Sequence, residues 1–94
     1  MRARFAEDKI EAALAAVPAW SRDGDAIVRT VECADFASAS VFVVRVGFLA
    51  EAKDHHPDID IRWRTVRLLL TTHDLGGLSE WDVELAAEID AVAP

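Results

Sequence analysis

All three histidines of this chain lie in two short polar segments, DHHPDIDIRW and TTHDLGG. His55 and His56 are adjacent in the first segment, and His73 lies in the second. Unperturbed imidazole titrates near pH ~6.5, so it can donate or accept a proton at neutral pH with little tuning. Such general acid–base help contributes about 10²–10⁴ in rate to a suitable reaction. The sequence therefore predicts acid–base catalysis on a small molecule.

The residues around the histidines favour a binding site. Pro57 restricts His56 to an extended or polyproline backbone, which constrains the direction of the His56 ring. Asp54 is placed to hold a neighbouring ring in one tautomer. Each histidine also falls at the end of a predicted element beside a turn, where binding residues concentrate. The alternative, three surface histidines without chemistry, is less favoured by this placement.

Metal binding is another possible role for these histidines. Zinc sites gather three or four ligands at characteristic spacings. Here His55 and His56 are adjacent, and adjacent side chains on an extended backbone point to opposite faces. The single cysteine, Cys33, is not close in sequence to any histidine. We therefore expect no metal ion in this site.

Length and composition indicate one globular domain that spans residues 1–94. The 94 residues are 52% hydrophobic and 29% charged, which is the composition of a globular protein. Because Cys33 is alone, no internal disulfide can form, and a reducing compartment is favoured. A chain this short often oligomerises to bury more surface.

Charge and hydropathy argue against nucleic acid and membrane partners. The net charge is −7, and the ten basic residues are scattered among seventeen acidic ones. The most apolar stretch, VFVVRVGFLA, is interrupted by Arg45 and is too short to span a bilayer. No continuous apolar run follows the N-terminal MRARFAEDK, so a secretory signal is not expected. The chain is expected to be soluble and cytoplasmic.

Two helices are predicted in the first half of the chain. Hydrophobic periodicity predicts a helix over residues 4–17, which Pro18 ends. Residues 36–53 are rich in β-branched and aromatic side chains, but the stretch is too long for one strand and Asp35 is a good N-cap. We therefore predict a long buried helix over residues 36–53, with one face formed by Phe36, Val43, Gly47 and Ala50.

Two β-hairpins are predicted on either side of the second helix. Residues 20–23 and 26–33 flank an Asp-Gly turn at 23–24. Apolar side chains fall on odd positions in IDIRWR and on even positions in VRLLLTTH. Because alternation cannot change parity inside one regular strand, a turn or bulge must lie near Arg64–Thr65.

The segment GGLSEWD opens a third helix. Ser79 and Asp82 have the spacing of a capping box, with Asp in place of the usual Glu. The predicted buried stripe of this helix is Leu85, Ala86, Ile89 and Val92. The element order is then α-β-β-α-β-β-α. Because hairpins make antiparallel neighbours, the predicted class is α+β: a four-stranded antiparallel sheet with helices packed on one face.

The chain resembles the pterin-4a-carbinolamine dehydratases, also called 4a-hydroxytetrahydrobiopterin dehydratases. The similarity extends from about Trp20 to Val92 and includes the predicted topology and the run THDLGGLSEWD. The positions that match the family pattern in register are Glu51, His55, His56, Pro57, Trp63, His73 and Asp82. The resemblance implies loss of water from a 4a-hydroxytetrahydropterin, without a metal or redox cofactor.

The resemblance also assigns roles to residues. It implies that His55 and His73 are general acids acting on different faces of the flat pterin, while His56 chiefly binds and orients it. It implies a substrate pocket that includes Asp54, Pro57, Thr72 and Asp74. Supporting roles fall to Glu51, Trp63 and Asp82. The residues after Pro57 are Asp58, Ile59, Asp60 and Ile61, where animal members are more aromatic, so the pocket wall is expected to differ.

The resemblance further implies partners. Members of the family pair sheet edges into dimers and stack helices into tetramers, so a homodimer or homotetramer is expected. An aromatic amino-acid hydroxylase is the implied metabolic partner, because it produces the substrate. The alternative is a non-catalytic role, since animal members also serve as dimerisation cofactors of a homeodomain transcription factor. Retention of all three histidines favours the enzyme.

Overall fold

The computed structural model describes residues 3–94, which form one four-stranded antiparallel sheet and three α-helices. In chain order the elements are α1 (Glu7–Leu14), β1 (Ser21–Asp23), β2 (Ala26–Glu32), α2 (Phe36–Lys53), β3 (Asp58–Arg62), β4 (Thr65–Leu70), the 3₁₀ turn η1 (His73–Leu75) and α3 (Glu80–Val92). The predicted α+β class and element order are confirmed.

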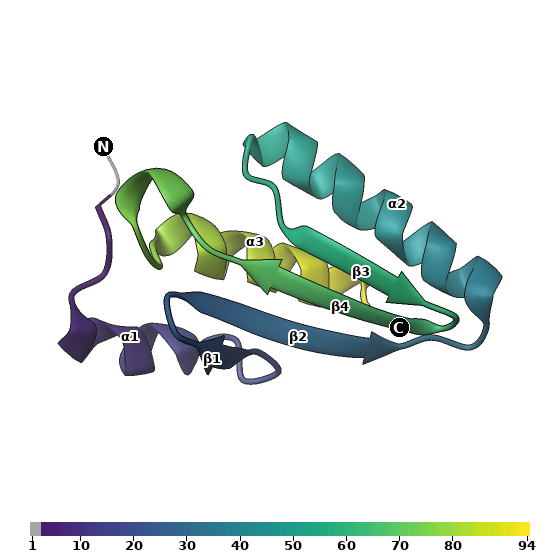
Figure 1. Ribbon diagram of the computed structural model, residues 1–94, viewed down its shortest axis with the longest axis horizontal. Helices are drawn as coiled ribbons and strands as arrows, with labels where there is room; N and C mark the ends of the chain where they lie inside the picture. Colours follow the sequence, from purple (N-terminus) through teal and green to yellow (C-terminus); the bar gives the residue numbers. More distant parts are fainter. Residues whose placement is uncertain (1–2) are drawn as a thin grey trace.

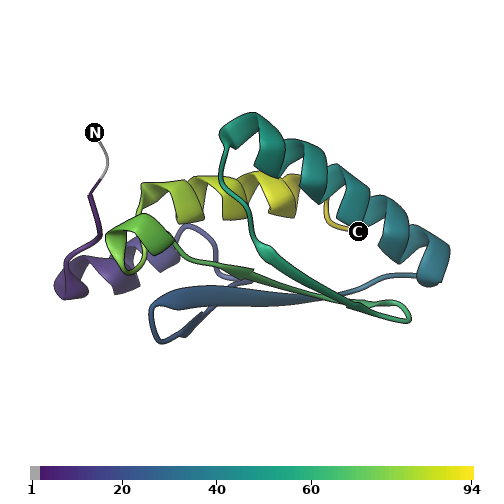
Figure 2. The same ribbon diagram turned by 45° about the horizontal axis from the view of Figure 1, so that its top comes forward.

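The sheet has the strand order β1-β2-β4-β3, with antiparallel pairing throughout (Figure 1). The long central pair runs from Ile27 opposite Leu70 to Glu32 opposite Thr65. Helices α2 and α3 lie on the same side of this sheet (Figure 2). Strand side chains that face the helices are buried at the central pair and form the core with them: Ile27, Val31, Val66, Leu68 and Leu70.

Helix α2 has the predicted bounds but not the predicted burial. Asp35 caps it, because its carboxylate accepts a hydrogen bond from the backbone N–H of Ser38 at 2.7 Å. The predicted buried face is wrong at Phe36 and Gly47, which are exposed. The side chains that α2 buries are Ala39, Phe42, Val46 and Ala50. Because this helix is hydrophobic on nearly every side, sequence periodicity alone could not select the core face.

The predicted ends of the first helix are also wrong. Helix α1 covers Glu7–Leu14, so it is shorter at both ends than the predicted 4–17. The backbone N–H of Phe5 donates to Leu78 at 2.8 Å, which ties the segment before α1 to the segment before α3. None of the described helices combines the length and the apolar character that crossing a bilayer requires.

The second hairpin turns one residue earlier than predicted. Strand β3 ends at Arg62 and β4 begins at Thr65, so Trp63 and Arg64 form the turn. Trp63 has a φ of 52°, in the left-handed region that a bulky side chain rarely adopts. The turn that the change of parity predicts is confirmed, and Trp63 belongs to this turn and not to the strand.

This hairpin brings the two polar segments together. Because β3 and β4 are antiparallel, the start of β3 and the end of β4 lie at the same end of the sheet. Residues 54–57 precede β3 and residues 71–74 follow β4, so they become neighbours. The Thr72–Gly77 bridge then turns the chain into α3, whose capping box of Ser79 and Asp82 is confirmed.

Truncation of a phenylalanine to alanine should lower the free energy of unfolding by different amounts on the two faces of α2. Phe42→Ala removes a ring that is 3% exposed, so it should lower the free energy of unfolding by about 3–5 kcal/mol. Phe36→Ala, at a ring that is 55% exposed on the same helix, should cost less than about 1 kcal/mol. Denaturant unfolding followed by circular dichroism measures both. Equal losses would contradict the observed orientation of α2.

Candidate active site

One cavity of about 510 Å³ collects all three histidines at one end of the sheet. This volume is in the range of small-molecule sites. Three parts of the chain line it, namely the end of α2 with the residues after it, the segment after β4, and the first turn of α3. The lining residues are Lys53, Asp54, His55, His56, Thr71, Thr72, His73, Asp74 and Trp81.

The end of α2 directs the chain into this cavity. Asp54 has a φ of 51° and a ψ of 43°, the left-handed conformation that terminates many helices. Its backbone N–H bonds to carbonyls of the last helical turn, and the N–H of His55 donates to Ala50 at 3.1 Å. Asp is among the few non-glycine residues that adopt this conformation readily. Asp54 therefore redirects the backbone so that the histidines follow immediately after the helix.

Asp82 is the centre of a buried hydrogen-bond network. Its side chain has no exposed surface. Oδ2 accepts from the backbone N–H of Ser79 at 2.9 Å and from the hydroxyl of Thr72 at 2.8 Å, and Oδ1 lies 2.6 Å from Nε2 of His55. Because the single hydroxyl proton of Thr72 is directed at Asp82, the Ser79 hydroxyl donates to Thr72 across 2.7 Å. A buried carboxylate is tolerated when it is hydrogen-bonded in this way.

This network fixes the ring of His55. An ionised carboxylate can only accept hydrogen bonds. Nε2 of His55 therefore carries the hydrogen and donates it in the bond to Oδ1 of Asp82. Nδ1 is then the ring nitrogen left for a ligand, as a base in the neutral ring and as an acid in the charged ring. The side chain of His55 is 11% exposed, and its ring centroid lies 6.1 Å from that of Trp81. His55 is therefore held in place at the cavity wall.

The other two histidines are held less firmly. Nε2 of His56 lies 3.0 Å from Oε1 of Glu51, but both side chains are mostly exposed, and exposed pairs of this kind contribute little. His73 begins the short turn η1 and is exposed, and its ring makes no hydrogen bond within residues 3–94. The cavity thus combines one mostly buried, hydrogen-bonded imidazole with two exposed ones.

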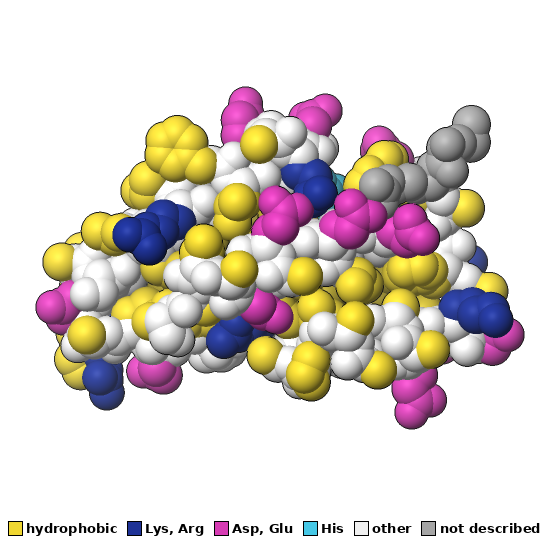
Figure 3. Space-filling model, turned by 180° about the vertical axis from the view of Figure 1, so that it is seen from behind, with side chains coloured by type: hydrophobic (Ala, Val, Ile, Leu, Met, Phe, Trp, Pro, Cys, Tyr) yellow, Lys and Arg dark blue, Asp and Glu magenta, His cyan; other side chains and the backbone are white. Residues whose placement is uncertain are grey.

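Lys53 joins two walls of the cavity. Its ammonium lies 2.9 Å from Glu88 and 3.4 Å from Glu84, so it ties the end of α2 to α3. The hydrogen bond to Glu88 raises the pKa of Lys53 above its usual value, and the charges of both glutamates add to this effect. Acidic side chains form a row across this face of the molecule (Figure 3). The pair of helices is therefore fixed beside the histidines.

Several predicted site residues lie outside the cavity lining. Glu51 contacts the site only through His56, and Pro57 leads away into β3. Trp63 is 70% exposed at the opposite end of the β3–β4 hairpin, where the guanidinium of Arg64 lies 5.0 Å from its ring centre. The structure does not bring Trp63 near the histidines.

Three lining residues were absent from the sequence prediction: Lys53, Thr71 and Trp81. Thr71 has a structural partner, since its hydroxyl donates to the carbonyl of Asp25 at 2.6 Å. No local spacing in the sequence marks Trp81 as a lining residue. Trp81 lies in the first turn of α3, and its ring comes near His55 through the docking of that helix.

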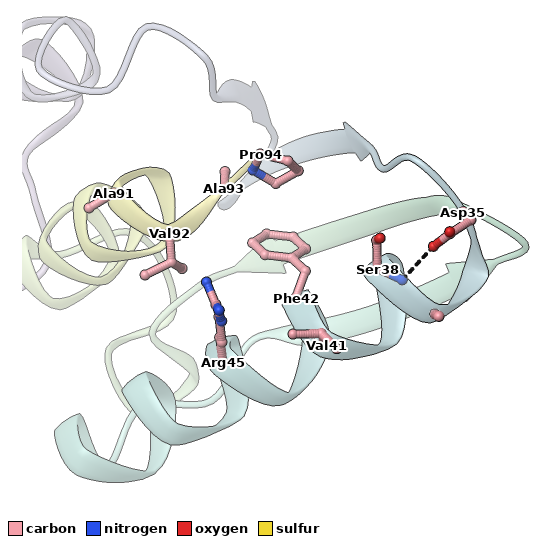
Figure 4. Close-up of a pocket in the computed structure, with 10 residues that line it drawn as sticks. Asp35, Ser38, Val41, Phe42, Arg45, Ala91, Val92, Ala93 and Pro94 are labelled. Atoms are coloured by element: carbon pink, nitrogen blue, oxygen red, sulfur yellow. Dashed lines mark hydrogen bonds between the residues drawn. The ribbon is translucent and has the colours of Figure 1, made fainter.

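A second cavity, of about 630 Å³, lies between α2 and the end of α3. Phe42 and Arg45 extend from α2 toward the segment 91–94 (Figure 4). The carboxylate of Asp35 at its edge is already bonded to Ser38. This cavity contains no histidine, so the acid–base groups belong to the first one. Within residues 3–94, no three His, Cys, Asp or Glu side chains are grouped to hold a metal ion.

Comparison with known proteins gives one family. Residues 3–92 match the family described as pterin 4 alpha carbinolamine dehydratase. A protein of Roseiflexus sp. (strain RS-1), named "putative pterin-4-alpha-carbinolamine dehydratase", is 51% identical over 92 residues, which cover 98% of this chain and 99% of that protein. A protein of the same name from Chloroflexus aurantiacus is 55% identical over 89 residues, with 95% and 96% covered.

A solved structure is also similar. The crystal structure of a transcriptional coactivator/pterin dehydratase from Brucella melitensis superimposes with a TM-score of 0.91 at 31% sequence identity. The superposition covers 97% of this chain and 99% of that chain. The similarity in fold therefore extends over the sheet and the helices.

Asp82→Asn should reverse the hydrogen bond at His55 while keeping the helix cap. If the amide oxygen keeps its bonds to Ser79 and Thr72, the amide NH₂ group faces Nε2 of His55, which must then accept. The ring proton should move to Nδ1. Nitrogen-15 NMR of the imidazole rings should show this change of tautomer in Asp82→Asn and not in the control Glu51→Gln. An unchanged tautomer would contradict the role assigned to Asp82.

Proposed function

The chain belongs to the pterin 4 alpha carbinolamine dehydratase family, and on that premise we propose that it removes water from a 4a-hydroxytetrahydropterin to give the quinonoid dihydropterin. It would act as a hydro-lyase in tetrahydropterin recycling. The observation that carries the proposal is His55, held by the buried Asp82 at the wall of a cavity that His73 also lines.

The proposed step is an elimination of water in which the protein only transfers protons. A protonated imidazole donates its proton to the 4a-hydroxyl group, and the C4a–O bond breaks with its electron pair leaving as water. The proton on N5 is removed, and the electrons of that N–H bond form the C4a=N5 double bond. Atoms and electrons balance without an oxidant or reductant. We therefore propose catalysis by imidazole acid and base groups, without a metal or redox cofactor.

The arrangement of the lining suggests a division of roles. His55 and His73 come from different segments of the lining, so we assign each to one face of the flat substrate. His56, which is exposed and lies beside Glu51, would bind and orient the ring. The carboxylates of Asp54 and Asp74 are acceptors that suit the amino and N3–H donors of a pterin. Thr72 is 3% exposed and donates to Asp82, so its hydroxyl serves the network around His55.

The proposed biological setting follows from the substrate. A 4a-hydroxytetrahydropterin is the product of an aromatic amino-acid hydroxylase, so such an enzyme is the proposed metabolic partner. A cytoplasmic location is proposed with it. The similar Brucella structure is described as a coactivator as well as a dehydratase, and a binding role beside catalysis is the alternative.

Self-association is proposed for two exposed surfaces. Val41, Val44 and Phe48 lie at i, i+3 and i+7 on α2 and are 53%, 57% and 74% exposed, an apolar stripe outside the core. Strand β3 is an edge strand that is exposed along its whole length, and its Ile59 and Ile61 are only partly covered. We propose a homodimer or homotetramer that covers these surfaces.

Alanine substitutions should separate the roles of the histidines. His56→Ala should raise KM most, because it removes binding shared by the ground and transition states. His55→Ala and His73→Ala should each lower kcat by about 10², each for a different 4a-hydroxy stereoisomer. On a racemic substrate the double variant should lose far more activity than either single variant, because each single variant keeps one of the two acids. The assay generates the 4a-hydroxy intermediate in situ and is run with and without a strong chelator.

Clear outcomes count against this assignment. Equal effects of His55→Ala and His73→Ala on both stereoisomers would contradict the two-face arrangement. Three variants with normal activity would refute the enzymatic proposal itself. A rate that is lost on chelation and restored by zinc would refute metal independence.

Oligomerisation can be tested separately from catalysis. Light scattering at micromolar concentration should report a multiple of 10.3 kDa for the unaltered protein. Phe48→Ser, which replaces the most exposed large hydrophobic side chain among residues 3–94, should lower that mass and leave the circular dichroism spectrum unchanged. A monomer before any substitution would rule out the proposed assembly.

A further inference from the structure

The histidine cavity is lined by one large aromatic side chain to which the proposed reaction assigns no role. Trp81, in the first turn of α3, is half-buried and lines the cavity. The other described lining side chains are those of Lys, Asp, His and Thr. Trp81 therefore provides most of the apolar ring surface that a ligand would meet there.

The position of this ring is tied to that of the proposed acid. The centroids of Trp81 and His55 are 6.1 Å apart with planes inclined by 37°, within the range of aromatic contacts. Trp81 directly precedes Asp82, whose carboxylate holds Nε2 of His55 at 2.6 Å. One turn of α3 thus places both the group that orients His55 and the ring beside it. A ligand that reaches Nδ1 of His55 lies within reach of the indole.

The strand that follows the paired histidines supplies no competing surface. Ile59 and Ile61 of β3 do not line the cavity, and Trp63 lies at the other end of the hairpin. The 2-amino-4-oxo half of a pterin is flat and conjugated, and flat nitrogen heterocycles stack on aromatic side chains with substantial gain. The aromatic surface for such a ring comes from α3.

We propose that the indole of Trp81 is the surface on which the pterin ring stacks, an inference that rests on the proposed function. Trp81 is then a substrate-binding residue that sets the plane of the ring beside His55. Because stacking acts on the whole ring, it holds the ground and transition states alike. Its loss should raise KM and change kcat much less.

The test compares Trp81→Leu, Trp81→Phe and Trp63→Leu in the full chain. 6-Hydroxymethylpterin, which is stable, is titrated by calorimetry and by absorbance, and dehydration is assayed in parallel. Trp81→Leu should weaken Kd and raise KM by on the order of tenfold and abolish the change in the pterin absorption band that stacking causes. Trp81→Phe should recover most of both. Trp63→Leu should change Kd and KM far less than Trp81→Leu.

Each other result overturns the inference. Equal losses in Trp81→Leu and Trp81→Phe would show that ring stacking is not involved. A loss confined to kcat, with a changed His55 imidazole NMR signal, would show a packing role for Trp81. Greater loss in Trp63→Leu would move the stacking surface to the hairpin turn. An active parent protein with an unaffected Trp81→Leu refutes stacking alone, whereas a parent protein that neither binds the pterin nor dehydrates the substrate refutes the proposed function as well.

Discussion

The burial of one carboxylate governs the arrangement of this site. A carboxylate with no exposed surface must have its oxygens hydrogen-bonded, and Asp82 obtains its partners from three separate parts of the chain. The backbone of Ser79 begins α3, Thr72 follows β4, and His55 follows α2. Satisfying this one group therefore fixes how the two polar segments and the third helix lie relative to each other. Helix capping and the orientation of His55 are consequences of the same contacts.

Local patterns in the sequence were sufficient for most of the fold. The capping box of α3, the N-cap at Asp35 and the parity change in the second hairpin each depend on neighbouring residues, and each led to an element that the structure contains. The errors arose where tertiary packing, and not the neighbouring sequence, determines the structure. Helix α2 has hydrophobic side chains on several faces, so its core face is chosen by the sheet and not by its own period.

The site was predictable for a similar reason, and only in part. Segments that flank two paired strands must meet at the sheet end, so the grouping of His55, His56 and His73 follows from the hairpin. Trp63 was expected to support the site because its spacing fits a motif, but the turn puts it at the far end of the strands. Trp81 was missed because its closeness to His55 depends on the docking of α3, a contact that no local spacing encodes.

The strand order has a consequence for how the chain folds. Each hairpin closes a short loop, but the central pairing of β2 with β4 closes one that contains all of α2 and β3. Loop-closure entropy grows with length, and pairings between distant segments slow folding. The cavity needs this central pairing and the docking of α3 as well. The cavity therefore needs pairings between segments that lie far apart in the chain, so its geometry forms only after α3 has docked on the assembled sheet.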